Sequence, residues 1–327
     1  MRRERSPEQL SAAHRENTRV SVVVPSYNHA PFVELTLRSI FRQTFAPAEL
    51  LVIDDGSTDS SPKIIEAVLH DCPFPCEFVA RKNRGLSATL NEGFARTRGE
   101  YFAYLGSDDL WLPDFLKGRV SLLESRVHAV LAYGHTYFID EQNAIVDCTA
   151  DWARYEDGNV REMLLQTTAP MSPTVLYRRE ALERQTWNEE SKLEDYDLYL
   201  RMSADGPFAF DPQVLSAWRR HSSNVSRDQT FMLEEQLRAQ RQGALRFGLT
   251  DEQVAKLQRS TRFSRAEDFL RLGQKSQALS LMIHNLRGVN APRPTARMLL
   301  RLLIPNGIMR RRVRARQRKV FERYGTL

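Results

Sequence analysis

Residues 98–116 read RGEYFAYLGSDDLWLPDFL, and this stretch decides the fold. Its apolar and aromatic run at 101–105 predicts a buried strand. The carboxylates Asp108 and Asp109 follow, and Pro113 then opens a helical pattern, where proline is tolerated. Because ligands bind at the carboxyl ends of strands in an open α/β sheet, the stretch predicts acidic side chains at a ligand-binding edge.

The acidic pair has two interpretations. Two oxygen donors in a loop suit Mg²⁺ or Mn²⁺ carried by a diphosphate. Alternatively, Asp108 and Asp109 end the strand and cap the next helix. The stretch alone leaves both open.

Before residue 98, apolar runs typical of strands alternate with segments whose apolar residues have helical spacing. We expect strands at 20–24, 50–53 and 78–80, and helices at 33–41, from 60 and at 86–94. This alternation predicts a mostly parallel, doubly wound α/β sheet.

Polar pairs follow three of the expected strands: Tyr27 with Asn28, Asp54 with Asp55, and Asp108 with Asp109. Each pair could serve turn chemistry alone, but three pairs at one edge indicate a binding site. The chain has neither G-x-G-x-x-G after its first strand nor G-x-x-x-x-G-K-[ST], which argues against a dinucleotide-binding dehydrogenase and a P-loop NTPase.

Composition indicates a globular protein, with 42% hydrophobic and 27% charged residues in 327. Three cysteines form neither a disulfide framework nor a zinc site, which suggests free thiols in a reducing compartment. The first residues lack the apolar core of a signal peptide, and no apolar run reaches the length of a membrane span. We therefore expect a cytoplasmic protein.

Charge is unevenly distributed. Residues 286–327 hold 12 of the 47 Lys and Arg residues and one of the 41 acidic residues, a net charge of +11. The total is +6, so the rest of the chain carries −5. This asymmetry predicts an anionic partner for the tail only.

Several segments, taken in order, resemble the family 2 glycosyltransferases, which have the GT-A nucleotide-diphospho-sugar transferase fold. The resemblance covers about residues 19–228. Its segments are VSVVVPSYN at 20–28, LVIDDGSTD at 51–59, NRG at 83–85, GEYFAYLGSDD at 99–109, LEDYDL at 193–198 and WRRHSSNVS at 218–226.

The resemblance implies inverting transfer of a sugar from a nucleotide diphosphate sugar, mostly a UDP-sugar. It implies that Pro25 and Tyr27 border the nucleobase and that Asp55 accepts a hydrogen bond from it. Asp108 would face the ribose or phosphates, and Asp109 would hold Mn²⁺ or Mg²⁺, which neutralises the leaving diphosphate. The same motifs add Asn28, Asn83 and Gly85 to the donor-binding residues.

Inversion needs a base opposite the leaving group. The resemblance assigns this role to Asp195, beside Glu194 on a predicted helix. Helix neighbours do not share a face, so we expect only one carboxylate to point into the cleft. Without the other motifs, the pair would read as an acidic cluster at a helix N-terminus.

His221 matches a histidine that adds a metal ligand in some family members. Arg219 and Arg220 suit either the diphosphate or solvated surface. Many members have Asp where this chain has Gly106, two residues before the final Asp-Asp pair.

We expect a polar extension at 1–18, a glycosyltransferase domain at 19–228 and a helical region with a basic tail at 229–327. The tail pairs an apolar turn at 298–304 with seven basic residues at 310–319, which favours an anionic membrane surface. No nucleic-acid module accompanies it, so we expect no nucleic-acid partner. The alternative is a helix packed on the catalytic domain through Leu299, Leu302 and Leu303.

Together these features predict a metal-dependent glycosyltransferase acting on a glycan or lipid-linked acceptor in cell-surface polysaccharide synthesis. It would be cytoplasmic and peripheral at the inner face of the cell membrane. The alternatives are a nucleotidyltransferase, which would usually show a glycine-rich loop after its first strand, and a non-catalytic sugar-nucleotide-binding protein.

Overall fold

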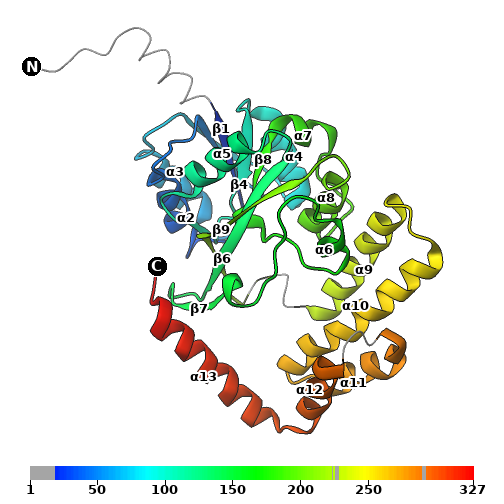
Figure 1. The fold of residues 1–327 in the computed structure, drawn as a ribbon. Coiled ribbons are helices and arrows are strands. Elements are labelled where there is room, and N and C mark those ends of the chain that lie inside the picture. Colours follow the sequence, from blue (N-terminus) through cyan, green and yellow to red (C-terminus); the bar gives the residue numbers. More distant parts are fainter. Residues whose placement is uncertain (1–18, 223, 225–227, 289–291) are drawn as a thin grey trace, which may run out of the picture.

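A nine-stranded mixed β-sheet forms the centre of the protein (Figure 1). The computed structural model describes residues 19–222, 224, 228–288 and 292–327, so the expected extension at 1–18 lies outside the described residues. The strand order is β3-β2-β1-β4-β8-β6-β9-β5, with β7 paired to β6.

The first half of the sheet is parallel, which confirms the prediction from strand–helix alternation. Its strands are β1 (Val20–Ser26), β2 (Glu49–Asp54), β3 (Cys76–Ala80) and β4 (Tyr101–Tyr104). The helices that alternate with them are α2 (Val33–Phe41), α3 (Ser61–Leu69) and α4 (Leu86–Arg96).

The second half adds antiparallel pairs that the sequence analysis did not anticipate. Strand β8 pairs antiparallel with β4 and β6, while β6 and β9 are parallel. The further strands are β5 (Leu110–Trp111), β6 (Leu131–Ile139), β7 (Ile145–Cys148), β8 (Leu176–Arg178) and β9 (Phe208–Arg219). Most are short, and β6 mixes polar and aromatic residues without alternation, so periodicity gives little signal.

Both faces of the sheet are buried under helices. Val22 and Val24 face one side, while Val23 faces the other, and all three are fully buried. The first side packs against α2, α3 and α5 (Phe115–Ser125), and the second packs against α4, α6 (Arg161–Leu165), α7 (Arg179–Arg184) and α8 (Glu194–Met202). Burial on both faces explains why the strands read as continuous apolar runs.

From Gln229 onward the described chain is helical, apart from its last residues. The helices are α9 (Gln229–Arg246), α10 (Asp251–Arg271), α11 (Lys275–His284), α12 (Pro292–Leu303) and α13 (Asn306–Tyr324). A small core that includes Phe263 and Phe269 joins α9 through α12. In the part of the chain that the structure describes, no helix is both long and apolar enough to span a bilayer.

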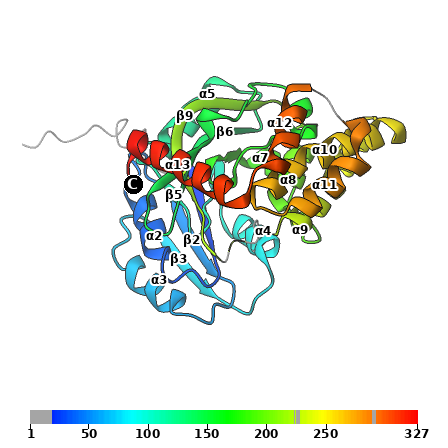
Figure 2. The same cartoon turned by 90° about the horizontal axis from the view of Figure 1, so that it is seen from below.

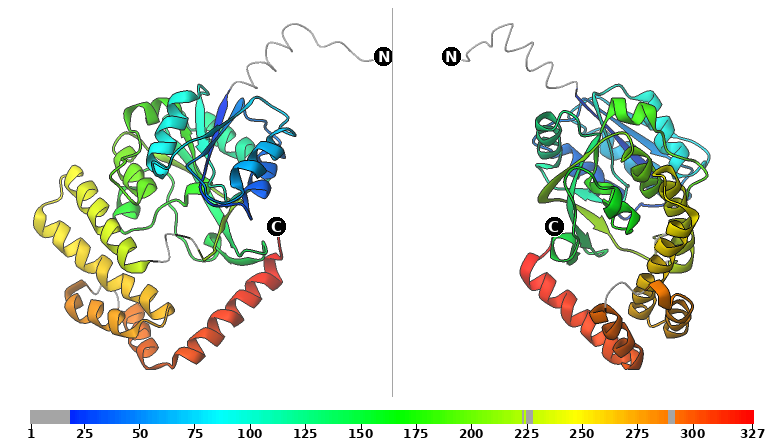
Figure 3. Two further views of the ribbon diagram at one scale, coloured as in Figure 1. Left: turned by 180° about the vertical axis from the view of Figure 1, so that it is seen from behind. Right: turned by 45° about the vertical axis from the view of Figure 1, so that its right-hand side comes forward.

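Helix α13 returns to the β-sheet domain, as Figure 3 shows from behind. Val320 packs with Ile139 and Ile145, and the backbone N–H of Ile145 donates to the Gly325 carbonyl at 3.0 Å. Thr326 forms an antiparallel bridge with Ala144. The tail therefore packs on the sheet at the end of α13. The leucines expected to make this contact do not make it, because Leu299 and Leu303 are exposed and Leu302 packs against the helical core.

Candidate active site

One cavity of about 880 Å³ gathers the side chains singled out in the sequence. It lies where β1, β2, β4 and β9 end and is closed on another side by α8, α9 and α10. Every residue assigned to donor binding, metal or catalysis lines it, whereas Arg219 and Arg220 do not: the lining includes Pro25, Tyr27, Asn28, Asp55, Asn83, Gly85, Asp108, Asp109, Glu194, Asp195 and His221.

Asn28 ties the loop after β1 to the loop after β2. Its backbone is left-handed, with φ of 55°, a conformation that Asn tolerates better than most residues. The Asn28 Oδ1 accepts from the Thr58 N–H at 2.8 Å, and its own N–H donates to Ser57 Oγ at 2.8 Å. Tyr27 remains 47% exposed beside this junction, free to meet a planar ligand.

Asp55 anchors the next loop. Its Oδ1 accepts from the Arg84 N–H at 2.9 Å and from the Arg81 guanidinium, and its Oδ2 accepts from the Gly85 N–H at 2.8 Å. A Cβ at Gly56 would lie 2.8 Å from the Asn83 nitrogen, so this approach requires glycine. Each carboxylate oxygen can accept about two hydrogen bonds, which leaves Oδ2 able to accept one from a ligand.

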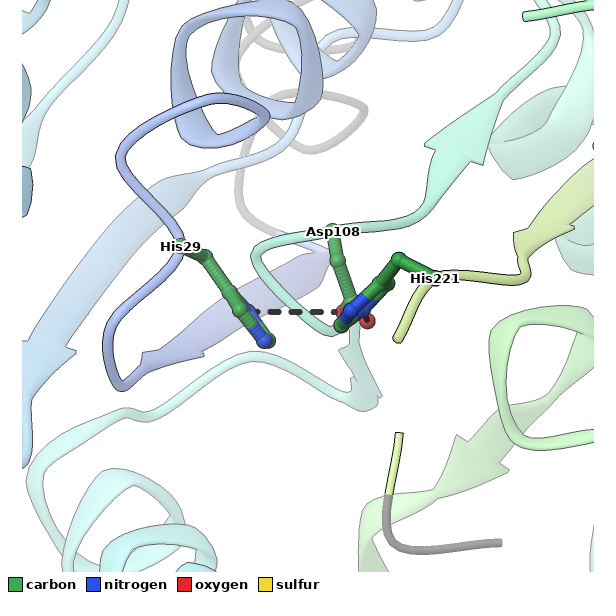
Figure 4. A group of neighbouring side chains, drawn as sticks. All are labelled: His29, Asp108 and His221. Carbon is green, nitrogen blue, oxygen red and sulfur yellow. Dashed lines mark hydrogen bonds and ion pairs between the residues drawn. The ribbon is translucent and has the colours of Figure 1, made fainter. Parts of the chain in front are cut away.

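His29, Asp108 and His221 form a cluster whose ligand atoms lie within 4.8 Å of one another (Figure 4). The His221 Nε2 lies 2.9 Å from Asp108 Oδ2, and the His29 Nδ1 lies 3.7 Å from Asp108 Oδ1. The sequence analysis missed His29, although it directly follows the Tyr27-Asn28 pair.

The two carboxylates of the acidic pair have different surroundings. Asp109 is buried, and its Oδ1 accepts from the Arg219 N–H at 2.8 Å. Burial and the charge of Asp108 raise the pKa of Asp109 well above the usual range. Burial also acts to raise the pKa of Asp108, but the His221 hydrogen bond and the two imidazoles outweigh it and lower that pKa.

Arg219 supports the acidic loop from behind instead of facing the cavity. Its side chain is buried, with Nε donating to the Asp108 carbonyl at 2.7 Å and a terminal nitrogen donating to the Asp140 carbonyl at 2.8 Å. Neither expectation for Arg219, diphosphate contact or solvated surface, was therefore correct. A local contact explains glycine at position 106, because a Cβ there would lie 2.8 Å from Asp108 Oδ1.

The cluster fits a divalent cation. Two imidazoles and one carboxylate are a mixed nitrogen and oxygen donor set, whereas Mg²⁺ strongly prefers oxygen ligands. Burial, reinforced by the charge of His221, lowers the pKa of His29 despite the opposing effect of Asp108. A neutral imidazole is the form that binds metal.

Glu194 and Asp195 both line the cavity, so the expectation that only one could face it was wrong. They begin α8, and side chains of a first helical turn tilt toward the N-terminus, where the cavity lies. Burial raises the pKa of both carboxyls, and the Asp195 charge adds to the effect on Glu194. Raised carboxyl pKa values in a cleft are typical of general acids and bases.

The far side of the cavity is built by the helical region and a short loop. Met171 and Ser172 contribute from the loop, and Gln236 and Arg265 contribute from α9 and α10. The Arg265 Nε donates to Gln236 Oε1 at 2.8 Å. The helical region therefore takes part in the site.

Solved structures share this architecture. Staphylococcus aureus TarS 1-349 in complex with UDP-GlcNAc aligns with a TM-score of 0.60 over 94% of this chain and 91% of that one, at 18% identity. Mannosyltransferase PcManGT from Pyrobaculum calidifontis, in complex with GDP-Man and Mn²⁺, gives 0.59 over 92% and 85%, at 17% identity. The fold is therefore that of the GT-A glycosyltransferases.

Residues 21–186, just over half of the chain, match the sequence model of Glycosyl transferase family 2. The chain belongs to this family of glycosyltransferases.

Two curated relatives share part of this chain. An uncharacterized glycosyltransferase from Nostoc sp., alr2836, is 29% identical over 51% of this chain and 52% of its own length. Chondroitin synthase from Escherichia coli is 26% identical over 63% of this chain and 30% of its own length. The chain thus spans about half or less of these two relatives.

Proposed function

We propose that the protein transfers a sugar, with inversion, from a UDP-sugar to a hydroxyl of a glycan or lipid-linked acceptor. The observation that carries the proposal is the single cavity that joins the His29–Asp108–His221 cluster to the Glu194–Asp195 pair. A cation site neutralises a leaving diphosphate, and a carboxyl pair supplies a base.

Pro25, Tyr27 and Asp55 would hold the nucleoside, with Asn28, Asn83 and Gly85 shaping the same rim. The free position on Asp55 Oδ2 suits the N–H of a uracil, and the exposed Tyr27 ring offers a stacking surface. The TarS structures in complex with UDP and UDP-GlcNAc support this donor class, while PcManGT in complex with GDP-Man keeps a guanosine donor as the alternative for testing.

His29, Asp108 and His221 would hold the cation, which stabilises the diphosphate charge when bound. Their donor atoms favour Mn²⁺ over Mg²⁺. The assignment of Asp109 as a ligand stays a prediction, but its Oδ1 already accepts from the Arg219 backbone. We therefore place Asp109 behind the cluster, where it positions the loop that carries Asp108.

Asp195 would remove the proton from the acceptor hydroxyl as that oxygen bonds to the anomeric carbon and the nucleoside diphosphate leaves. A base with a raised pKa takes up that proton more readily. Glu194 would share the proton with Asp195, since two close carboxyls titrate as a pair.

The acceptor would enter along Met171, Ser172 and Arg265. A peripheral position on the cytoplasmic face of the cell membrane would give the enzyme access to lipid-linked acceptors during cell-surface polysaccharide synthesis. The match to chondroitin synthase, itself named for polysaccharide synthesis, supports this choice.

Thermal unfolding with a panel of UDP- and GDP-sugars, with and without Mn²⁺, tests the donor. A ligand at 100 times its Kd should stabilise the fold by roughly 2.7 kcal/mol. We expect protection by one or more UDP-sugars that grows with Mn²⁺, and NMR of the product should show the anomeric configuration opposite to that of the donor. Protection by no nucleotide sugar, or retention of configuration, would refute the proposal.

A further inference from the structure

The C-terminal helices carry a surface outside the transfer site that would supply the peripheral membrane position of the proposed function, on which this inference rests. We define the lipid face as the outward side chains of α12 and α13: Leu299, Leu300, Leu303, Arg311, Arg314 and Arg318. Only residues 304–305 separate the two helices, and both lie on the lower edge of the molecule, in front in the view from below (Figure 2).

Helix α12 is apolar on both sides. Met298 is buried in the helical core, and Leu302 packs against it. On the other side, Leu299, Leu300 and Leu303 are 51%, 62% and 80% exposed. At 100° per residue, Leu300 and Leu303 lie roughly opposite Met298. The core therefore does not need these leucines, and clustered exposed leucines mark an interaction surface.

Helix α13 continues this face with positive charge. Met309 and Val320 are buried on its inner side, and Arg311, Arg314 and Arg318 follow the opposite side at i, i+3 and i+7. Within the described residues, Arg311 and Arg314 form no ion pair, and Arg318 pairs with Glu322 at 3.1 Å.

Inner-side charges of the same helix are matched instead. Arg316 lies 3.2 Å from Asp147, and Arg323 lies 3.0 Å from Asp151. The pairs that attach α13 to the catalytic domain are thus separate from the arginines of the lipid face.

We propose that the lipid face binds the surface of an anionic bilayer. Leucines of an interfacial helix enter the boundary between headgroups and acyl chains, while adjacent arginines meet lipid phosphates. A nucleic acid would leave the leucines exposed to water. A second copy across a two-fold axis would bring identical basic stripes together. A bilayer offers acyl chains to the leucines and anionic phosphates to the arginines.

Co-sedimentation of the full chain with phosphatidylcholine vesicles, with and without 40% phosphatidylglycerol, tests the proposal. We expect binding to the anionic vesicles at low salt and release at high salt, since Debye screening weakens exposed charges. Replacing Arg311, Arg314 and Arg318 by Gln should lower the partition coefficient by about 100-fold at low salt. The Leu300→Ser/Leu303→Ser variant should lose about tenfold.

A matched control removes the same charge elsewhere. Lys63, Lys117 and Arg184 are exposed on the catalytic domain and make no ion pair in the described structure, so their triple Gln variant should bind vesicles almost as the unchanged protein does. Circular dichroism and donor protection should be unchanged in all three variants, which separates lipid binding from the proposed transfer.

Three results would overturn the proposal. They are no binding to anionic vesicles at low salt, an equal loss in the control variant, and light scattering that shows a dimer which the Leu300→Ser/Leu303→Ser variant abolishes. The third result would assign the face to a second copy of the chain.

Discussion

Replacing Asp55 by Ala should destabilise the whole domain as well as the donor site. The carboxylate is only 4% exposed, and it accepts from the backbone N–H groups of Arg84 and Gly85. Without it, these two donors lose their acceptor in a site with little access to water. Each unsatisfied donor costs roughly 1–3 kcal/mol.

Arg81 limits the loss of stability because it keeps other hydrogen-bond partners. Its guanidinium also donates to Glu92 at 2.9 Å and to Thr89 Oγ1 at 2.8 Å, so it keeps partners when Asp55 is removed. Adding roughly 1 kcal/mol for its lost hydrogen bond gives a loss of about 3–7 kcal/mol in the free energy of unfolding. Asp55→Asn keeps one acceptor oxygen and should lose about half as much.

Urea denaturation followed by circular dichroism measures the loss. Asp71→Ala is the matched control, because Asp71 also pairs with an arginine, at 3.5 Å from Arg38, but its side chain is 64% exposed. Exposed pairs contribute about 0–1 kcal/mol. A loss below about 1 kcal/mol for Asp55→Ala, or equal losses in the two variants, would contradict the reasoning from buried hydrogen bonds.

Three predictions concern the reacting groups. Asp108→Asn should weaken Mn²⁺ binding by well over 100-fold in titration calorimetry, and Asp109→Asn by no more than about 10–100-fold, the range for a supporting residue; the reverse order would return the ligand role to Asp109. Asp195→Asn should cut kcat by at least about 100-fold with donor affinity nearly unchanged, and parallel losses would make Asp195 a donor-site residue. Because burial raises the pKa of Asp195, kcat/KM should fall on acidification with a midpoint pH above the ordinary carboxyl pKa of about 4. Above the raised pKa, the buried ionised carboxylate should lower the free energy of unfolding. Asp195→Asn should therefore raise the Tm near neutral pH and lose this advantage below about pH 4; an acid limb at or below pH 4 would argue against a buried base.

The parallel half of the sheet could be predicted because its strands are buried on both faces and read as short apolar runs, as in residues 20–24. The polar residues after them could then be assigned to one edge, since parallel strands end on the same side. That logic predicts Tyr27, Asp55 and Asp108 at one edge of the sheet, and all three line the cavity there.

The roles within the acidic pair depended on side-chain direction, which sequence order does not specify. Asp108 and Asp109 are neighbours, but one points toward two histidines and the other toward the Arg219 backbone. His29 escaped notice because a single histidine in a loop carries no periodic signal. Its partner His221 lies far away in sequence, and only the fold brings the two together.

The same limit applies to the tail. Val320 and Tyr324 lie in a basic helix, and their contacts with β6 and β7 are long-range. The sequence predicted a helical region with a basic tail, but it could not predict where the end of α13 attaches.

The attachment of α13 to β7 has a mechanical consequence. A region joined to its neighbour at one place can rotate about that place, whereas a region attached at both ends cannot rotate freely. The helical region is attached along α9, where Ala239 lies in the main core and Gln240 donates to the Leu165 carbonyl at 2.6 Å, and again at Thr326, which bridges to Ala144. Rotation between the two regions would have to break the bridge between Thr326 and Ala144, so the last few residues of the chain restrain that rotation. The Leu327 N–H donates to the Asn143 carbonyl at 3.2 Å. An affinity tag fused after Leu327 would therefore disturb this attachment directly.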